Sequence, residues 1–530
     1  MNSMTSIATD ELEKLQQQLA IFQKNNAELE QTNSKLQAKV NWFEEQYRLA
    51  QLKRFGRSSE KHDGQIELFN EAEVIADEDN AQADDLSERQ TITYTWKKPG
   101  RKPLPKDLPR EVIRHELPES EQVCSCGCQL HVIGEDKTEQ LDFIPAKIKV
   151  IEHVQVKYGC RACEQGVTVA PKPPQPIPRS IATPGLLSYV IVSKFLDSLP
   201  LYRQEGIFKR LAIDIPRATL SNWVLKSAEL LKPYYDRLLY YLILEKIIQA
   251  DETTLRVVQD GRDSNTKSYM WLYQSGSLEP GHSIILYDYQ PTRAGEHAKT
   301  FLSGFKGTVQ CDGFSGYNAL TKNNNPVTLI GCMAHARRKF DEAYKALPAK
   351  SKQKPGMAQM ALAKIRKLYA IEKQIKNLSS EQRYLLRQAK SKPVLEDLKA
   401  YAEKSVLRTP KDSLIGQAFR YLLNQWESLI GYINDGNLQI DNNAAERSIK
   451  PFVIGRKNWL MNQTARGANA SALLYSLMQT AKANNLEPYA FLRYILTEIP
   501  LLGRHHLTEE LDQFMPWNMN ETIPLLNKVG

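Results

Sequence analysis

The sequence predicts a multidomain α+β protein, and three observations carry that prediction. An apolar heptad repeat spans residues 11–50, five of the seven cysteines fall within residues 124–163, and five short apolar runs rich in β-branched residues follow residue 246. The 530 residues suit roughly three to five domains of ordinary size. Hydrophobic residues make up 42% and charged residues 25%, which excludes collagen-like, low-complexity and disulfide-scaffold proteins.

The charge is divided unevenly along the chain. The net charge is +9, from 70 basic and 61 acidic residues. Residues 1–90 hold 10 basic and 18 acidic residues, a net of −8, so the remainder carries +17. A basic body behind an acidic front indicates a polyanionic partner for the body. The N-terminal segment MNSMTSIATDELEKL has no secretory pattern, and no apolar run reaches about 18 residues. We therefore expect a cytoplasmic protein with no membrane partner.

Residues 1–60 are predicted to form a leucine-zipper coiled coil. Asn26 and Asn33 occupy two of the a positions, where paired Asn side chains fix the register of a two-stranded coil. A homodimer or higher oligomer is therefore expected, although an amphipathic helix packed on its own chain is the alternative. The apolar and Asn positions of the repeat are Leu12, Leu15, Leu19, Phe22, Asn26, Leu29, Asn33, Leu36, Val40, Phe43, Tyr47 and Ala50.

Residues 61–118 are predicted to be a linker that is first acidic and then basic. Nine acidic and no basic residues lie within 67–88, a composition typical of a flexible tether. The segment 96–110, WKKPGRKPLPKDLPR, is basic and holds four prolines, which exclude a helix or a central strand. It could lie extended along a phosphate backbone or serve only as a solvated linker.

Residues 119–172 are predicted to form a zinc-binding module. Cys160 and Cys163 form a C-x-x-C pair that suits half of a tetrahedral four-sulfur structural zinc site. Cys126 and Cys124 are the expected partners from the irregular segment CSCGC, with Cys128 as the alternative to Cys124. A redox role is the weaker interpretation, because no βαβ pattern precedes the pair. Cys311 and Cys332 lie in apolar strand-like runs and are expected to be buried packing residues.

Residues 173–246 are predicted to be a helical segment resembling a helix-turn-helix. Residues 201–211 and 216–231 have the proportions of two helices joined by a short turn. Arg217 and Asn222 would lie near the start of the second helix, where a recognition helix meets bases. A plain helical hairpin is the alternative.

Residues 247–478 are predicted to form an α/β domain, followed by a helical tail at 479–530. Five strand-like runs are KIIQADETTLRVV, SYMWLYQSG, HSIILYDYQ, GTVQCDGF and VTLIGCMAH, with a helix at GEHAKTFLSGF between the third and fourth. About 341–440 reads as mostly helical, and PFVIGRKNWLM (residues 451–461) reads as a strand.

Carboxylates follow two of the predicted strands. Asp251 and Asp312 each come after a buried run, and a third carboxylate, Glu446, lies in IDNNAAERSIKPF. Carboxylates that converge at strand ends suit hard divalent cations, and three could complete a two-metal site. The alternatives are a capping pair of Glu446 with Asn443, or an ordinary ion pair for Asp251. The other candidate carboxylates are Asp288 and Asp441.

Longer strings resemble the transposases of the IS66 insertion-sequence family, within the DDE/D group. The resemblance runs from the zipper through EDKTEQLDFIPAKIKVIEHVQVKYGCRACE, VSKFLDSLPLYRQEGIF, QADET, CDGFSGY, GCMAHARRKFDEA and DNNAAERSIKPFVIGRKNWL to a tail near MPW. It implies an RNase H-like α/β catalytic core with a helical insertion before the last acidic residue. Asp251, Asp312 and Glu446 match the family's acidic triad. The departure is the CSCGC half of the zinc module, which leaves its ligands open.

The resemblance also implies an activity and its partners. The expected function is a bacterial, nucleoid-associated DNA transposase that binds the terminal inverted repeats of its element, hydrolyses phosphodiesters and transfers strands into target DNA. Two Mg²⁺ (or Mn²⁺) ions per active site, a structural Zn²⁺ and small accessory proteins of the same element are expected with it. The alternatives are a transposase-derived regulator without catalysis, or a nuclease that cuts but does not join. The expected DNA contacts are His335, Arg337, Arg338, Arg447, Lys450, Arg456 and Lys457, besides Arg217 and Asn222.

Overall fold

The computed structural model divides the chain into two compact units, residues 85–172 and the remainder. It describes residues 2–55, 149–154, 157–159, 167–169, 173–263, 265–279, 281–322, 326–348, 356–503 and 507–519. In the 85–172 unit, β1 (Lys157–Gly159) pairs antiparallel with β2 (Val167–Val169). The expected zinc ligands Cys124, Cys126, Cys128, Cys160 and Cys163 lie outside the described residues.

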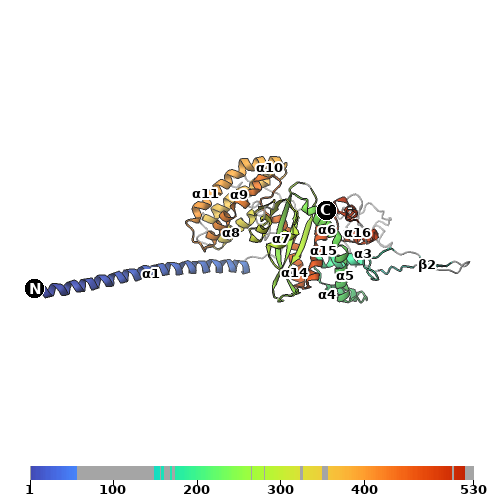
Figure 1. Ribbon diagram of the computed structural model, residues 1–530, viewed down its shortest axis with the longest axis horizontal. Coiled ribbons are helices and arrows are strands. Elements are labelled where there is room, and N and C mark those ends of the chain that lie inside the picture. The colour runs from blue at the N-terminus through green and yellow to red at the C-terminus, as the bar shows by residue number, and fades with distance from the viewer. Residues whose placement is uncertain are drawn as a thin grey trace, which may run out of the picture. The chain divides into compact units, whose positions relative to one another are not determined.

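The N-terminal heptads lie on one long helix. α1 runs from Asn2 to Phe55, a length of 54 residues, and is the blue helix of Figure 1. The segment contains neither glycine nor proline, so nothing in it interrupts the helical hydrogen bonds. Leu29 is 65% exposed and Leu36 is 55% exposed in the single chain. The predicted helix is confirmed, and its apolar stripe faces outward.

Four helices follow residue 173, as the sequence predicts. They are α3 (Pro184–Phe195), α4 (Leu201–Arg210), α5 (Arg217–Leu230) and α6 (Lys232–Ile243). Thr183 caps α3 by accepting the backbone N–H of Leu186 at 3.2 Å. Pro216 is the residue directly before α5, where its missing N–H leaves no helical hydrogen bond unmade.

A mixed sheet forms the centre of the larger unit. The strands are β3 (Ile247–Gln259), β4 (Lys267–Ser275), β5 (Ile285–Gln290), β6 (Gly307–Gln310) and β7 (Val327–Ile330). Their order is β5-β4-β3-β6-β7, with β3, β4 and β5 antiparallel and β3, β6 and β7 parallel. All five predicted strands are present, and the predicted helix between the third and fourth is α7 (Gly295–Phe301). A 3₁₀ helix, Ser315–Thr321, lies between β6 and β7.

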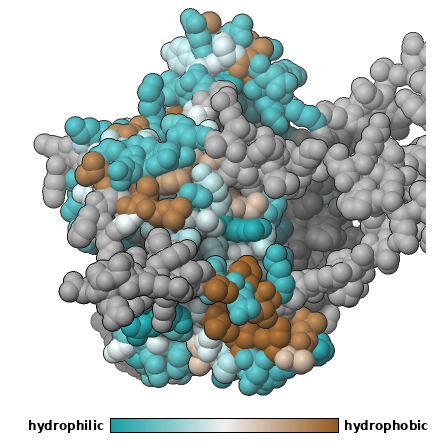
Figure 2. Space-filling model, turned by 90° about the vertical axis from the view of Figure 1, so that its right-hand side faces the viewer, coloured by the Kyte–Doolittle hydropathy of each residue, from teal (hydrophilic) through white to brown (hydrophobic). Residues whose placement is uncertain are grey.

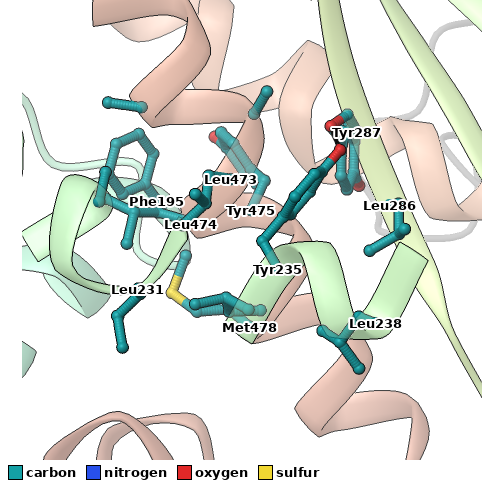
Figure 3. Packing of buried hydrophobic residues seen from close by; sticks show 14 of the residues in the cluster. Phe195, Leu231, Tyr235, Leu238, Leu286, Tyr287, Leu473, Leu474, Tyr475 and Met478 are labelled. Atoms are coloured by element: carbon teal, nitrogen blue, oxygen red, sulfur yellow. Dashed lines mark hydrogen bonds between the residues drawn. The ribbon is translucent and has the colours of Figure 1, made fainter. Parts of the chain in front are cut away.

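The edge strand β5 is covered by α15 (Ala465–Ala483). The hydroxyl of Ser476 accepts the backbone N–H of Tyr287 at 2.7 Å, and the hydroxyl of Thr480 accepts that of Ile285 at 3.0 Å. These bonds satisfy edge donors that would otherwise be open to another strand. Figure 3 shows Leu474, Tyr475 and Met478 of α15 packed among residues of α3, α6 and β5. The largest apolar cluster therefore joins the sheet to the helices on both sides of it in sequence.

The predicted helical insertion has a core of its own. Its helices are α8 (Met333–Lys345), α9 (Met357–Ile375), α10 (Ser380–Leu386), a π-helical turn (Arg387–Ser391), α11 (Lys392–Val406), α12 (Leu414–Asn424), α13 (Trp426–Ile430) and a 3₁₀ turn (Gly431–Asn434). Figure 1 shows α8 to α11 grouped apart from α3 to α6, with the strands between them. A separate apolar cluster holds this group, and includes Phe340, Leu368, Leu398 and Phe419.

The prediction of a strand at 451–461 is wrong. α14 runs from Asn443 to Trp459, with Pro451 inside it. The buried positions Ala445, Ile449 and Phe452 recur at helical spacing, and this face packs on the sheet. The hydroxyl of Tyr287 donates to the carbonyl of Ser448 in the turn that contains the proline. Packing against the sheet therefore overrides the β-propensity of the PFVI run.

The chain ends in short helical elements. β8 (Asn462–Thr464) pairs with the far end of β3, and α15 follows it. α15 continues through residue 478, where the sequence analysis placed the end of the α/β domain. The remaining elements are α16 (Pro488–Glu498) and the 3₁₀ turns Ile499–Leu502, Thr508–Phe514 and Pro516–Asn518. Among the described residues, no helix is both long and apolar enough to span a bilayer. Among the residues that Figure 2 colours, hydrophilic ones prevail, with separate apolar patches between them.

Candidate active site

Asp251 and Asp312 lie side by side on parallel strands. Gln249 of β3 is in register with Gln310 of β6, and each aspartate stands two residues beyond its glutamine. Since residues two apart on a strand share a face, Asp251 projects from the same face as Gln249, and the charge of Asp312 contributes to its raised pKa. Asp251 lies within β3, in register with Leu272 of β4, so the expectation that it follows the end of a strand is wrong, whereas Asp312 lies just past the end of β6. Their oxygens accept the backbone N–H groups of Glu252 and Phe314, both at 2.9 Å.

Three buried glutamines, Gln249, Gln274 and Gln310, form a row of hydrogen bonds beside this pair, which we call the glutamine ladder. Gln249 Nε2 donates to Gln310 Oε1 at 3.0 Å, and Gln274 Nε2 donates to Gln249 Oε1 at 2.9 Å. Gln310 Nε2 in turn donates to the carbonyl of Gln439 at 2.6 Å. The ladder crosses β4, β3 and β6 and reaches the segment that precedes α14. Buried polar networks of this kind fix strand register when most members are paired.

Glu446 comes to the sheet from the first turn of α14. Asn442 Nδ2 donates to the backbone carbonyl of Ala250 at 2.8 Å, which ties the start of α14 to β3 directly before Asp251. Asn442, not Asn443, is the residue directly before α14, and its side chain makes no capping hydrogen bond. The alternative of a capping pair between Glu446 and Asn443 is therefore not what the structure has. Glu446 is 4% exposed. Its burial therefore comes from tertiary packing rather than from helix capping.

Asp251, Asp312 and Glu446 are a group of interacting charges, which we call the carboxylate cluster. Burial raises the pKa of Asp251 well above its usual value, and the negative charges of Glu252, Glu446 and Asp312 raise it further. Burial also raises the pKa of Glu446, with contributions from Asp441 and Asp312, while Arg338 opposes the rise. Raised carboxylate pKa values in a buried group of like charges are typical of sites that bind cations.

α8 supplies a histidine and an arginine to Glu446. Nη2 of Arg338 lies 3.2 Å from Oε2 of Glu446, and Nδ1 of His335 lies 3.6 Å from Oε1. Burial and the charge of Arg338 lower the pKa of His335 to about 4, so the imidazole is neutral near pH 7. His335 is therefore an uncharged neighbour of Glu446, and the positive charge beside this carboxylate comes from Arg338.

The burial of Arg337 does not fit the DNA contact expected from the sequence. It is 5% exposed and lies on the same face of α8 as Met333 and Phe340, which belong to the core of the insertion. The period of the helix turns His335 and Arg338 toward Glu446 and turns Arg337 inward. The three residues are neighbours in sequence, but only two of them reach the carboxylate cluster.

The other expected DNA contacts lie on the surfaces of two helices. On α14, Arg447 and Lys457 are exposed, while Lys450 and Arg456 are partly buried. Nη1 of Arg456 lies within hydrogen-bonding distance of the hydroxyls of Thr253 and Thr254 on β3, at 3.4 and 3.2 Å. On α5, Arg217 and Asn222 are both exposed in the first two turns.

Glu252 organises a second polar group that the sequence analysis did not identify. Its side chain is 2% exposed, and it accepts the hydroxyl of Tyr317 at 2.6 Å and the Nε of Arg293 at 2.9 Å. The guanidinium of Arg293 lies over the ring of Phe314, 3.7 Å from its centroid. Glu252 directly follows Asp251 in the string QADET, and this adjacency is the sequence feature that could have indicated its role.

The two competing carboxylates have separate environments. Asp288 is in register with Trp271 and Glu252, so it projects from the face opposite to Asp251. Burial raises the pKa of Asp288 to about 6, against a hydrogen bond from Gln290. Asp441 is buried and accepts the hydroxyl of Tyr369 at 2.9 Å. It also accepts the backbone and side-chain N–H groups of Asn443, which makes it a structural anchor before α14.

Models of known protein families match most of this chain from residue 42 to residue 517. A family model described as "Transposase IS66 family" matches residues 179–470, more than half of the chain. The chain belongs to this family. Models described as "zinc-finger binding domain of transposase IS66", "Transposase C of IS166 homeodomain" and "IS66 C-terminal element" match residues 121–164, 42–113 and 476–517. The predicted IS66 membership is thus confirmed, and the zinc-binding character of the 119–172 region is supported.

Relatives of this IS66 transposase are uncharacterized proteins of Sinorhizobium fredii (strain NBRC 101917 / NGR234). The protein y4jD is 34% identical over 423 residues, which cover 78% of this chain and 81% of the relative. The protein y4hP is 33% identical over 471 residues, which cover 86% of this chain and 83% of the relative. The similarity therefore extends through the carboxylate cluster as well as the flanking helices.

The residues at the cluster fit a hard divalent cation such as the family implies. Oε1 of Glu446, Oδ1 of Asn442 and Oδ1 of Asn443 are buried oxygens with no hydrogen-bond donor. Carboxylate and amide oxygens are the ligands that Mg²⁺ and Mn²⁺ prefer. Neighbouring negative charges repel one another, and buried oxygens without a hydrogen-bond donor are costly. A bound cation would reduce both costs.

Proposed function

We propose that this IS66 transposase cuts DNA at the ends of its element and joins those ends to target DNA, with Asp251, Asp312 and Glu446 as the catalytic carboxylates. The observation that carries the proposal is the register of β3 with β6. It sets Asp251 beside Asp312, and the Asn442 bond to Ala250 adds Glu446 from a segment almost two hundred residues away. Asp251 and Glu446 both have a pKa raised by burial and by neighbouring carboxylates, which favours a cation-dependent reaction over a purely structural role.

We assign the α/β domain to the RNase H-like fold. The strand order β5-β4-β3-β6-β7, with three antiparallel strands followed by two parallel ones, supports this assignment. So does the position of the helical insertion, which enters after β7 and leaves before the helix that carries Glu446. In this fold, Asp251 of β3 and Asp312 after β6 would lie on the part of the sheet where the DNA substrate binds.

Asp251, Asp312 and Glu446 would hold two Mg²⁺ or Mn²⁺ ions. When bound, the ions activate the attacking oxygen and stabilise the leaving oxygen of a phosphodiester. Arg338 holds Glu446 through Oε2 and leaves Oε1 without a hydrogen-bond donor. The Gln249–Gln310 bond keeps the two aspartates in register, so that the carboxylates are positioned before DNA arrives.

The proposed reaction has two phosphoryl-transfer steps at one site. In the first, a water oxygen bonds to phosphorus at the element end, and the bond from phosphorus to the 3′ oxygen breaks. In the second, the freed 3′ hydroxyl bonds to a target phosphorus, and a target 3′ oxygen leaves. Neither step needs a covalent bond to the protein, so no serine or tyrosine nucleophile is required.

The proposed DNA contacts are basic residues that are exposed or partly buried, together with Asn222. Arg447, Lys450 and Lys457 extend along α14 from the turn of Glu446, in a position to follow a phosphate backbone. Arg456 and Arg338 lie closer to β3 and to Glu446, with His335 beside them. Arg217 and Asn222 are proposed to read bases or phosphates from the start of α5, as in a helix-turn-helix.

The remaining parts are proposed to assemble the complex on DNA. Cys124, Cys126, Cys160 and Cys163 would bind a structural zinc ion, with Cys128 as the alternative ligand. α1 would pair with a second copy, and small proteins of the same element would join the assembly. The proposed division is a zipper (1–60), a linker (61–118), a zinc module (119–172), a helical DNA-binding segment (173–246), a catalytic domain (247–478) and a tail (479–530).

The test is a reaction with labelled element ends, a target plasmid and Mg²⁺ or Mn²⁺. The intact chain should cut and join the ends, whereas Asp251→Asn, Asp312→Asn and Glu446→Gln should bind them without cutting. Asp288→Asn is the matched control, because that carboxylate is partly buried in the same sheet but projects from the opposite face. Its rate should stay close to that of the unaltered chain.

The same reaction separates the alternatives. A transposase-derived regulator would bind the ends with no metal-dependent cleavage by the unaltered chain. A nuclease would cut the ends but leave the target plasmid without joined products. If the three triad variants cut as fast as the unaltered chain, the catalytic assignment is wrong.

A further inference from the structure

Cys332, His335 and Glu446 form a compact group of three different donor types. Cys332 is the residue directly before α8, His335 lies in the first turn of α8, and Glu446 lies in the first turn of α14. One ligand atom from each residue lies within 4.8 Å of the other two. Among the residues that the structure describes, no other group of three His, Cys, Asp or Glu residues meets this condition, including Asp251, Asp312 and Glu446 together.

Two ligand atoms of this group have no hydrogen-bond partner. His335 Nδ1 and Glu446 Oε1 are both buried and have no hydrogen-bond partner, although they lie 3.6 Å apart. In a tetrahedral zinc site the metal lies about 2.0–2.3 Å from its ligands, which sets nitrogen and oxygen ligands roughly 3.3 Å apart. The His335–Glu446 pair is therefore only slightly wider than such a site requires, and Cys332 Sγ lies within 4.8 Å of a ligand atom of each residue. Leaving two buried lone pairs unused is costly unless a ligand takes them.

The sulfur is held in place by its surroundings. The backbone N–H of Asn442 donates to Cys332 Sγ at 3.2 Å, and the N–H of Met333 donates to the carbonyl of Ile440 at 3.2 Å. These bonds join the start of α8 to the segment before α14, so that Cys332 and Glu446 approach from two anchored backbones. Burial and the charges of Asp441 and Glu446 raise the pKa of the Cys332 thiol, whereas the N–H donor lowers it, so the bound ion itself must stabilise the thiolate.

We propose that Cys332, His335 and Glu446 form a binding site for a zinc-class transition-metal ion, which takes Glu446 away from the carboxylate cluster when it is occupied. A thiolate and an imidazole select Zn²⁺, Co²⁺ or Cd²⁺ over Mg²⁺, which prefers oxygen ligands. Binding replaces the thiol proton of Cys332, which is released to solvent. The site is therefore a candidate for inhibition of the transposase by zinc. That consequence rests on the proposed function, whereas the binding itself does not.

The binding test uses the full chain and Co²⁺, which replaces zinc and reports thiolate ligands by absorbance. The chain is freed of metal with a chelator and titrated with Co²⁺, in parallel with Cys332→Ser and His335→Gln. Each variant should bind one Co²⁺ per chain fewer than the unaltered protein, and Cys332→Ser should also lose part of the thiolate-to-cobalt absorbance. Cys311→Ser is the matched control, because Cys311 is also a buried free cysteine but lies outside the group.

His335→Gln keeps the test decisive if Cys332→Ser fails to fold, since His335 is the more accessible ligand, with a side chain that is 25% exposed. Equal cobalt stoichiometry in the unaltered chain and both folded variants would overturn the proposal. The zinc module is unchanged in every variant, so its contribution cancels.

A competition measurement connects the site to the carboxylate cluster. Excess Mg²⁺ should weaken binding of the Cys332-dependent Co²⁺, since both ions draw on Glu446, and Zn²⁺ should slow Mg²⁺-dependent cleavage less in His335→Gln than in the unaltered chain. Cobalt binding without any DNA cleavage would leave this site intact and refute the proposed function. DNA cleavage without Cys332-dependent cobalt binding would refute this site and leave the proposed function intact.

Discussion

Nη2 of Arg338 lies 3.2 Å from Oε2 of Glu446, although the two residues are 108 positions apart in the sequence. Burial raises the pKa of Glu446, and the charge of Arg338 lowers it, so the arginine keeps a buried carboxylate ionised. The proposed reaction requires Glu446 as a carboxylate. Arg338 is therefore expected to set the lowest pH at which the site can work.

Arg338→Gln should move the acid limit of cleavage to higher pH. Removing the cation raises the pKa of Glu446, so a higher pH is needed to ionise the same fraction of sites. A rise of one unit would reduce the rate roughly tenfold below the new pKa and change it little well above that pKa. Single-turnover cleavage at saturating DNA, measured across pH, reports the shift apart from any loss of DNA affinity. Arg408→Gln, an exposed arginine of the insertion, is the control. An equal loss of rate at every pH would contradict this role.

Neutralising Asp251 should stabilise the metal-free protein. The folded-state pKa of Asp251 lies well above its unfolded value, so the native state binds more protons between the two values. The free energy of unfolding then falls as pH rises through that window and stays low at neutral pH. Asp251→Asn removes this cost, and should raise the free energy of unfolding at pH 7 by about 1 kcal/mol or more.

Thermal unfolding tests that expectation without any assay of activity. The Tm of Asp251→Asn should exceed that of the unaltered chain by roughly 2–4 °C per kcal/mol near pH 7. The difference should vanish at acid pH, where Asp251 is protonated, and shrink when Mg²⁺ is added. Asp214→Asn, at an exposed aspartate between α4 and α5, should show neither effect. An Asp251→Asn variant that is less stable at pH 7 would show that repulsion does not dominate at this site.

The sequence was sufficient to predict the parts of the site that depend on local pattern. The five strands follow from β-branched apolar runs, and the positions of Asp251 and Asp312 predict carboxylates on neighbouring strands, although Asp251 lies within β3 rather than at its end. Their pairing depends on the parallel register of Gln249 with Gln310, which a single sequence does not contain. The helix at Asn443–Trp459 was mistaken in part for a strand, because its apolar PFVI run has high β-propensity and burial at helical spacing was not visible.

The rest of the site depends on contacts between distant segments. The role of Arg337 follows from which face of α8 meets the core of the insertion, and that core is assembled from helices up to residue 440. The association of Cys332 with Glu446 likewise depends on the bond from Asn442 to Cys332, across 110 residues. The spacing of Cys332 and His335 was a local signal, but without Glu446 it did not distinguish a ligand from a packing residue.

Replacing Leu29 and Leu36 with serine should reduce self-association of the chain. Both side chains occupy d positions of the heptad repeat, and they are 65% and 55% exposed in the single chain. Burying each leucine against a second copy should contribute about 1.5–3 kcal/mol, so losing two per chain should shift the monomer–oligomer equilibrium by several powers of ten. Sedimentation velocity over a range of concentrations measures the shift. Serine at Gln31 and Ala38, on the outer face of the same helix, is the matched control. An unchanged oligomer in the leucine variant would exclude α1 as the dimer contact.

Lys457→Gln should lower the salt dependence of DNA binding without altering sequence preference. Lys457 is exposed in the last turn of α14, where a contact to a phosphate releases a counterion and adds about 0.9 to the slope of log K against log salt. Binding of labelled element ends, measured from low to moderate salt, should therefore lose roughly one unit of slope. Binding to unrelated DNA should lose the same amount, because a phosphate contact carries no sequence information. Lys404→Gln, at an exposed lysine in the last turn of α11, removes the same charge from the insertion and should leave the slope unchanged. If both variants lower the slope equally, DNA responds to net charge rather than to a contact at α14.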